Sequence, residues 1–355
     1  MPDQSRRRQF FYRAFATVFS ALFMFSVLEV AVRRMALPDP ELIEYMDRVV
    51  EKPAELTYYA TRPSDFRQFG WDSKQDIYFP SEEALDETPA APLVLIVGDS
   101  VTRGKDVAED DAYPSVLFRM LEEEREIRLI NAAVNGYGVD QMILKLEQSI
   151  ETYRPDVVVF AYIPHDLWRS GRNINWGLTK PVLKDIRVDS WRVIASPDMQ
   201  PYYQSYMDAD RGYYRTFWYL RHVSENMPYY FPGLYESYYE ALFNAIRMRL
   251  VSLAERYGLE VLVVRLPSTW PGSPIGALDD LAKVAFDEPS PHPDYTFHDL
   301  DDCVRSLANE SGIDFEESYR WHPQRIGHEI YAKCLLNPLR HSIEICSDGS
   351  CEKDQ

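Results

Sequence analysis

A short apolar run that ends in glycine is the feature that most constrains the fold of this chain. Residues 92–97 read Pro-Leu-Val-Leu-Ile-Val, and Gly98, Asp99 and Ser100 follow directly. The run is rich in β-branched residues and bounded by Pro and Gly, which is typical of a strand buried in a parallel sheet. Open sheets of this kind bind ligands just beyond the carboxyl ends of their strands. Ser100 is therefore a candidate nucleophile, which needs a histidine to take its proton. Alternatively, Asp99 and Ser100 only cap the next helix.

Strand-like and helical patterns alternate along residues 91–340. Strands are predicted at residues 92–97, 127–131, 156–162, 259–266 and 313–315, and helices at 113–124, 139–153, 238–257, 300–310 and 326–336. This alternation predicts an α/β fold, with a parallel sheet covered by helices on both faces. Residues 167–235 interrupt it as an aromatic-rich insertion. The insertion is either a lid over the site or a helical excursion with its own aromatic core.

The N-terminus has the composition of a transmembrane helix. Three arginines at residues 6–8 precede an apolar stretch over residues 14–32, and two arginines follow it. With its flanks, this stretch is just long enough to cross a hydrocarbon core of about 30 Å. An uncleaved anchor is favoured over a signal peptide, because no small-residue cleavage site follows. We expect a cytoplasmic tail and anchor at 1–35, a stalk and lead-in at 36–90, the main domain at 91–340 and a C-terminal tail at 341–355.

Charge and cysteine content restrict the partners and the compartment. A formal net charge of −18 argues against a nucleic-acid partner, which requires a basic surface. The cysteines lie near the C-terminus, at Cys303, Cys334, Cys346 and Cys351. Their even number fits two disulfides in an oxidising compartment, with Cys346 and Cys351 close enough to form a small loop; four free thiols are the alternative. No zinc site is expected without a Cys-x-x-Cys pair, and no cofactor is predicted.

Further motifs fall at successive predicted strand ends. The second strand runs into Asn135-Gly136-Tyr137-Gly138, and the third into Pro164-His165-Asp166. His322-Pro323 and Gly327-His328 accompany the closing helix. A glycine at a strand end allows the backbone N–H of Gly136 to face a reacting oxygen, as an oxyanion hole requires. Glycines alone would indicate only a turn.

Taken in order, these motifs resemble those of the SGNH, or GDSL, hydrolase family over about residues 91–340. The resemblance implies a flavodoxin-like α/β/α sandwich and acyl-serine chemistry on esters. It implies that Ser100 is the nucleophile and His322 the base, with the N–H groups of Ser100 and Gly136 donating to the oxyanion. His328 is expected to be a packed structural residue.

Two positions depart from the family pattern. Where the family has an asparagine that completes the oxyanion hole, this chain has His165, whose imidazole can still donate an N–H. Alternatively, His165 belongs to a turn that Asp166 caps. Where the family has an aspartate three residues before the histidine, this chain has Tyr319. Glu316 and Glu317 lie close enough in sequence to orient the histidine instead, as could a backbone carbonyl.

These expectations combine into a membrane-anchored serine esterase of SGNH type. The domain would lie on the extracytoplasmic, periplasmic side and cleave an ester of a carbohydrate or lipid. The same serine and histidine would also serve an O-acyltransferase, in which a sugar hydroxyl intercepts the acyl-enzyme. A non-catalytic binding or scaffold protein on this fold is the third hypothesis, because both departures affect the site.

Overall fold

The structure is a computed structural model that divides into two units, Met1–Glu55 with Asp198–Asn226, and Leu56–Pro197 with Met227–Gln355. The described residues are 2–34, 77–79, 90–175, 178–187, 190–194, 220, 223–224, 226–269, 276–289, 292–319 and 322–347.

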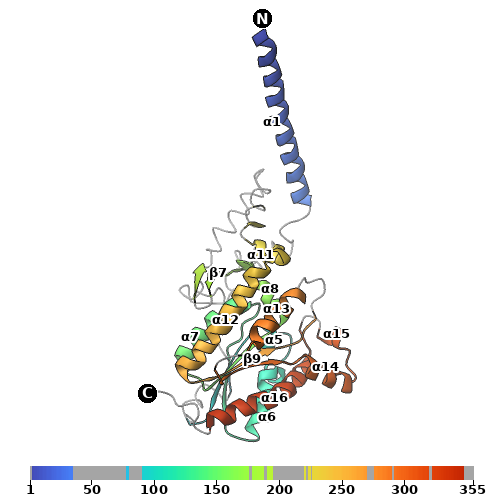
Figure 1. Ribbon diagram of the computed structural model, residues 1–355. Helices are drawn as coiled ribbons and strands as arrows, with labels where there is room; N and C mark the ends of the chain where they lie inside the picture. Colours follow the sequence, from blue (N-terminus) through green and yellow to red (C-terminus); the bar gives the residue numbers. More distant parts are fainter. Residues whose placement is uncertain are drawn as a thin grey trace, which may run out of the picture. The chain divides into compact units, whose positions relative to one another are not determined.

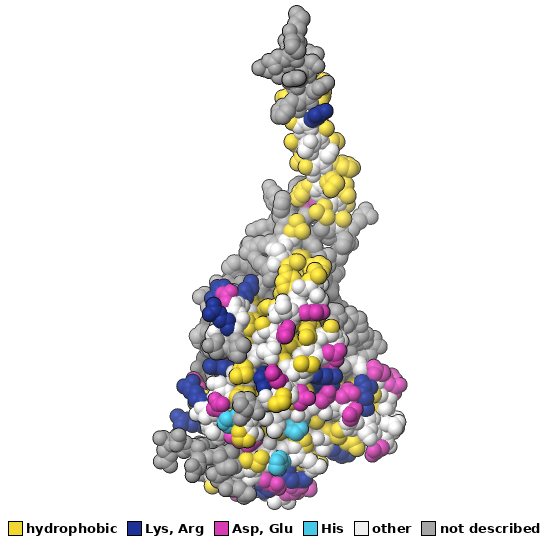
Figure 2. Space-filling model, viewed as in Figure 1, with side chains coloured by type: hydrophobic (Ala, Val, Ile, Leu, Met, Phe, Trp, Pro, Cys, Tyr) yellow, Lys and Arg dark blue, Asp and Glu magenta, His cyan; other side chains and the backbone are white. Residues whose placement is uncertain are grey.

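The first unit contains α1 (Pro2–Arg34), a single continuous helix (Figure 1). Its stretch Phe11–Ala31 has a mean hydropathy of 1.9, and no other described helix is long and apolar enough to cross a membrane. Its large apolar side chains, such as Phe15 and Phe23, are exposed, and Figure 2 shows hydrophobic groups along the helix. This composition fits a membrane anchor or a signal sequence.

The second unit is built on a six-stranded sheet with the order β1-β3-β2-β4-β9-β10. The strands are β1 (Ile77–Phe79), β2 (Leu93–Val97), β3 (Arg128–Asn131), β4 (Val157–Tyr162), β9 (Glu260–Arg265) and β10 (Tyr295–Asp299). All are parallel except β1, which pairs antiparallel with β3 at the edge. In chain order the parallel strands lie 2-1-3-4-5, which is the flavodoxin-like order. The predicted fold class is confirmed.

Helices cover both faces of the sheet (Figure 1). One face carries α6 (Tyr113–Glu122), α14 (Asp301–Glu310) and α16 (Arg325–Ser347), and the other α7 (Val139–Tyr153), α12 (Glu236–Tyr257) and α13 (Gly276–Asp287). Strand residues are buried on both sides: Val94 and Ile96 pack toward α6 and α16, while Leu95 points to the opposite face. The chain order reverses between β2 and β4, so the loops after these strands flank the switch point where such sheets bind ligands.

One predicted strand is wrong. The fifth parallel strand is β10, not residues 313–315, and residues 315–318 form the short helix α15 (Phe315–Ser318). The side chain of Asp314 accepts a hydrogen bond from the backbone N–H of Glu317 at 3.2 Å and so caps α15. A capping aspartate stabilises a helical turn, and a three-residue apolar run is too short to specify a strand.

The described part of the insertion consists of short elements. It forms two hairpins, β5 (Ile174–Asn175) with β6 (Leu178–Thr179) and β7 (Val182–Arg187) with β8 (Ser190–Ile194), followed by the short helix α11 (Met227–Tyr230). Between the hairpins, Lys180 is fully buried, with Nζ 2.5 Å from Asp140 Oδ2 at the start of α7. Residues 195–219 of the insertion lie outside the described residues.

A disulfide joins α14 to α16 through Cys303 and Cys334, which are 31 residues apart. The predicted small loop between Cys346 and Cys351 lies outside the described side chains.

Replacing Cys303 and Cys334 together by serine should lower the free energy of unfolding by about 3–4 kcal/mol. The bond restricts the unfolded chain by closing a loop of this length. Urea unfolding of the detergent-solubilised protein, followed by tryptophan fluorescence, measures the loss. The reduced wild-type protein should behave like the double variant. A difference under about 1 kcal/mol from the oxidised wild type would contradict this expectation.

Candidate active site

Ser100 begins α5 (Ser100–Arg103), the single helical turn that follows β2. The side chain of Asp99 accepts a hydrogen bond from the N–H of Val101 at 2.9 Å. Asp99 therefore caps α5, as one of the two sequence interpretations expected. Gly98 allows the turn to approach its neighbours, because a Cβ there would lie 2.3 Å from Thr102 Oγ1 and 2.9 Å from the carbonyl oxygen of Ala161 in β4. Ser100 is itself fully buried at the end of β2.

The structure brings His322 to Ser100 from the loop between α15 and α16. The Nε2 atom of His322 lies 2.8 Å from Ser100 Oγ, across 222 residues of sequence. On the other side of the ring, Nδ1 lies 2.9 Å from Asp106 Oδ2. A neutral imidazole that donates its Nδ1 proton to Asp106 keeps a lone pair on Nε2 for the serine proton. This is the hydrogen-bonded arrangement of nucleophile, base and orienting acid that serine hydrolases use.

The carboxylate that contacts His322 belongs to Asp106, and not to Glu316 or Glu317, the two acids that the sequence suggested. The Glu316 side chain pairs with Arg305 at 3.4 Å, and Glu317 is exposed within α15. Tyr319 is fully buried, and its hydroxyl donates to the carbonyl of Gly327 at 3.4 Å, so this position is part of the core.

Sequence reasoning missed Asp106 because its role depends on an unusual backbone conformation. Asp106 has a φ of 72°, in the left-handed region that is uncommon for residues other than glycine. That conformation redirects the chain six residues after the nucleophile, so that the side chain reaches His322. The nearest signal in the sequence was Gly104, which also has a positive φ, of 81°.

The electrostatic surroundings of His322 suit a general base. Burial lowers the pKa of His322 below its ordinary value of 6.5, and the carboxylates of Asp99 and Asp106 act in the opposite direction. The ring is therefore neutral at neutral pH and able to accept a proton. The two carboxylates favour the imidazolium that forms when it does so.

The loop that carries Gly136 is hydrogen-bonded to the turn that carries Ser100. Gly136 has a φ of 80°, which strains any other residue, and the N–H of Tyr137 donates to the carbonyl of Val134 at 3.3 Å to close the turn. The N–H of Val134 donates to the carbonyl of Gly98 at 3.0 Å. These bonds hold the loop after β3 against the end of β2.

His165 lies in α8 (Pro164–Arg169), directly after β4, and is almost fully buried. Its ring packs edge-on against Trp168, with centroids 5.3 Å apart. Burial, together with the charges of Arg169 and Arg172, holds the pKa of His165 far below 6.5, so the ring is neutral and carries a single N–H. Asp166 caps the helix, since its Oδ2 accepts from the N–H of Ile163 at 2.9 Å.

His328 has a structural environment, as the sequence suggested. Its Nδ1 accepts from the N–H of Tyr113 at 3.2 Å, and its ring stacks on that tyrosine. Among the described residues, no group of three or more His, Cys, Asp or Glu side chains could hold a metal ion.

No family model matches the sequence. No curated protein matches it. Similar solved structures include a lipase/acylhydrolase from Enterococcus faecalis, with a TM-score of 0.41 and 15% identity over 70% of this chain and 96% of that one.

Two further structures show the same level of similarity. A putative lipolytic protein of the G-D-S-L family from Desulfitobacterium hafniense has a TM-score of 0.37 and 11% identity, over 69% of this chain and 98% of that one. The acetylxylan esterase Axe2 from Geobacillus stearothermophilus has a TM-score of 0.33 and 15% identity, over 69% and 93%. All three of these TM-scores are below 0.5, so the similarity carries no argument about function.

Replacing Asp106 by asparagine should lower kcat by about a hundredfold or more, because a neutral amide no longer stabilises the imidazolium of His322. Asparagine also tolerates the left-handed conformation, so the backbone should be kept. Since a negative charge is lost, the pKa of His322 falls further, and the acidic limb of the kcat/KM profile should move to lower pH. Turnover of p-nitrophenyl acetate across the pH range measures both effects.

Glu316→Gln is the matched control, since it removes a nearby carboxylate that does not contact His322. It should leave the rate and the pH profile unchanged. If it shifted the profile and Asp106→Asn did not, Asp106 would not be the orienting acid.

Proposed function

We propose that this chain is a serine ester hydrolase of SGNH type. The observation that carries the proposal is the hydrogen-bonded array of Ser100 Oγ, His322 and Asp106, with distances of 2.8 and 2.9 Å. The array lies at the switch point of the sheet, where folds of this order bind their ligands.

The reaction follows from the positions of the protons. His322 Nε2 takes the proton of Ser100 as Oγ attacks the ester carbonyl, and the imidazolium then gives that proton to the departing alcohol. The backbone N–H groups of Ser100 and Gly136, with the single N–H of His165, donate to the oxyanion. A water molecule, deprotonated by His322, then attacks the acyl-serine and releases the acid.

The proposed location is the extracytoplasmic face of a membrane. The Phe11–Ala31 stretch of α1 serves as the anchor, and the disulfide between Cys303 and Cys334 suits an oxidising compartment. A domain tethered beside a membrane meets O-acylated carbohydrates and lipid esters, which are the proposed substrate class.

A fluorophosphonate probe should label the wild-type protein at Ser100. The labelled protein should lose turnover of p-nitrophenyl acetate in proportion to labelling. Ser100→Ala should not be labelled, and His322→Ala should be labelled at least about a hundredfold more slowly, because it lacks the base. In-gel fluorescence and mass spectrometry of the modified peptide read the result. A folded wild-type protein that neither labels nor hydrolyses esters would instead support the non-catalytic scaffold hypothesis.

His165→Ala should reduce kcat by about a hundredfold to a thousandfold, the usual effect of removing one side-chain oxyanion donor. His165→Asn should retain most of the activity, since an amide also donates an N–H. Steady-state kinetics with p-nitrophenyl acetate distinguish the two variants. Equal rates for His165→Ala and the wild type would assign His165 to packing against Trp168 alone.

A further inference from the structure

Arg169 is a buried arginine at the end of α8, and its contacts join the motifs around the active site. The side chain is fully buried. Its Nη1 atom lies 2.6 Å from Asp166 Oδ1, 3.2 Å from Asp99 Oδ2 and 3.3 Å from the carbonyl oxygen of Tyr137. One nitrogen therefore contacts the loops that follow β4, β2 and β3.

Each contact fixes a different part of the proposed machinery. Asp99 precedes the nucleophile, caps its helical turn and lies with Oδ2 3.1 Å from Ser100 Oγ. Tyr137 follows Gly136, and its N–H is already bonded to Val134, so Arg169 fixes the remaining backbone polar group of that residue. Asp166 caps the turn that carries His165.

We propose that Arg169 is a positioning residue that sets the oxyanion donors relative to Ser100. This inference depends on the proposed esterase function. The oxyanion donors come from three separate loops, and small displacements of such donors are costly because their effect depends on fixed geometry. Arg169 does not touch the reacting atoms; it acts through the loops that it joins.

Arginine suits this position better than lysine. The guanidinium remains charged when buried, whereas a buried lysine readily loses its charge. Here the cation also lies between two buried carboxylates, Asp99 and Asp166. Burial and the charge of Asp99 raise the pKa of Asp166 well above its ordinary value, and the charge of Arg169 acts in the opposite direction.

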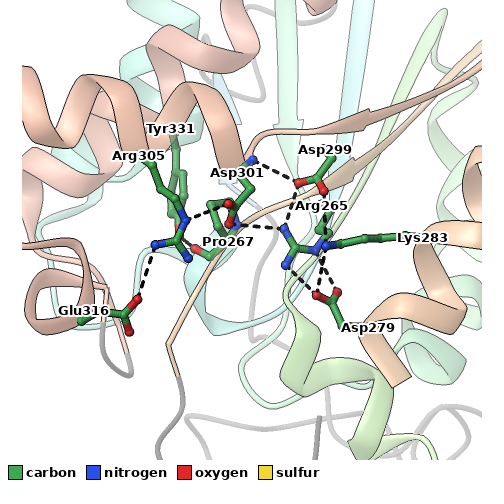
Figure 3. A network of polar contacts seen from close by, with 9 residues as sticks. All are labelled: Arg265, Pro267, Asp279, Lys283, Asp299, Asp301, Arg305, Glu316 and Tyr331. Carbon is green, nitrogen blue, oxygen red and sulfur yellow. Dashed lines mark hydrogen bonds and ion pairs between the residues drawn. The ribbon is translucent and has the colours of Figure 1, made fainter. Parts of the chain in front are cut away.

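The chain offers a matched control in Arg265, at the end of β9 (Figure 3). Arg265 is also buried, and it bonds to Asp279 at 2.6 and 2.8 Å and to Asp299 at 2.8 Å. It joins α13 to β10 at the same edge of the sheet. Its partners Asp279, Asp299 and Asp301 all lie outside the loops that carry Ser100, Gly136 and His165. A substitution of Arg265 therefore measures the effect of disturbing a buried arginine away from the site.

The experiment compares Arg169→Lys with Arg265→Lys in the full-length protein. The rate of fluorophosphonate labelling, and kcat and KM for p-nitrophenyl acetate, are measured per folded molecule, with the folded fraction taken from circular dichroism. Arg169→Lys should slow labelling and lower kcat by about tenfold to a hundredfold with KM nearly unchanged, since only transition-state contacts are affected. Arg265→Lys should lower the Tm and leave the labelling rate of the folded protein unchanged.

A second variant keeps the test decisive if Arg169→Lys does not fold. Arg169→Gln with Asp166→Asn removes one positive and one negative charge, so the net charge of the buried cluster is kept. It should also slow labelling at least tenfold. The positioning role would be overturned if either Arg169 variant folded and was labelled at the wild-type rate. It would also be overturned if both Arg169 variants failed to fold while Arg265→Lys folded. If the wild-type protein itself did not label, the esterase proposal would fail and this inference with it.

Discussion

The site depends on one constraint: at Gly98, the turn that carries Ser100 approaches β4 closely. No side chain fits at this position, because the carbonyl of Ala161 and the side chain of Thr102 occupy the space. The turn can therefore lie directly on the neighbouring strand, and Ser100 is held at the point where the strand order reverses. The carbonyl of Gly98 also accepts the N–H of Val134, so the same residue holds the loop of Gly136. A larger residue at position 98 would separate all of these elements at once.

Asp106 shows how the proposed catalytic arrangement can be kept when a motif residue is replaced. At the position of the family aspartate, Tyr319 packs among Phe315 and Tyr331 in the core. A carboxylate at Nδ1 of His322 can come from any element that reaches the ring. Here it comes from the loop after α5, in which Asp106 adopts a left-handed conformation. Such strain, of order 1–3 kcal/mol for residues other than glycine, is typical of functional sites and is sustained by the surrounding structure.

Most of the fold could be predicted because the parallel strands are continuous buried runs bounded by glycine, proline or polar residues. The run at residues 156–162 gives β4 within one residue, and the spacing of Met142, Leu146 and Ile150 gives α7. β10 was missed because its sequence, Tyr-Thr-Phe-His-Asp, is half polar and lies at the edge of the sheet. Of the proposed site, Ser100 and His322 carry motif signals. Asp106 and Arg169 do not, since their roles depend on a single φ angle and on the convergence of three loops.

The buried charges near Ser100 indicate that this part of the structure fixes the geometry of the site rather than adding stability. Asp99, Arg169 and Asp166 are all fully buried, and removing such groups from water costs several kcal/mol per ion before their attraction is counted. Apolar residues of similar volume often stabilise a fold as well as a buried ion pair does, so stability alone does not explain this cluster. A guanidinium, however, is directional: its position determines where Asp99 Oδ2 and the carbonyl of Tyr137 lie. An apolar core in the same place would pack these loops together without fixing their rotation. A charged core is the better solution if, as proposed, these loops carry oxyanion donors that must keep one orientation.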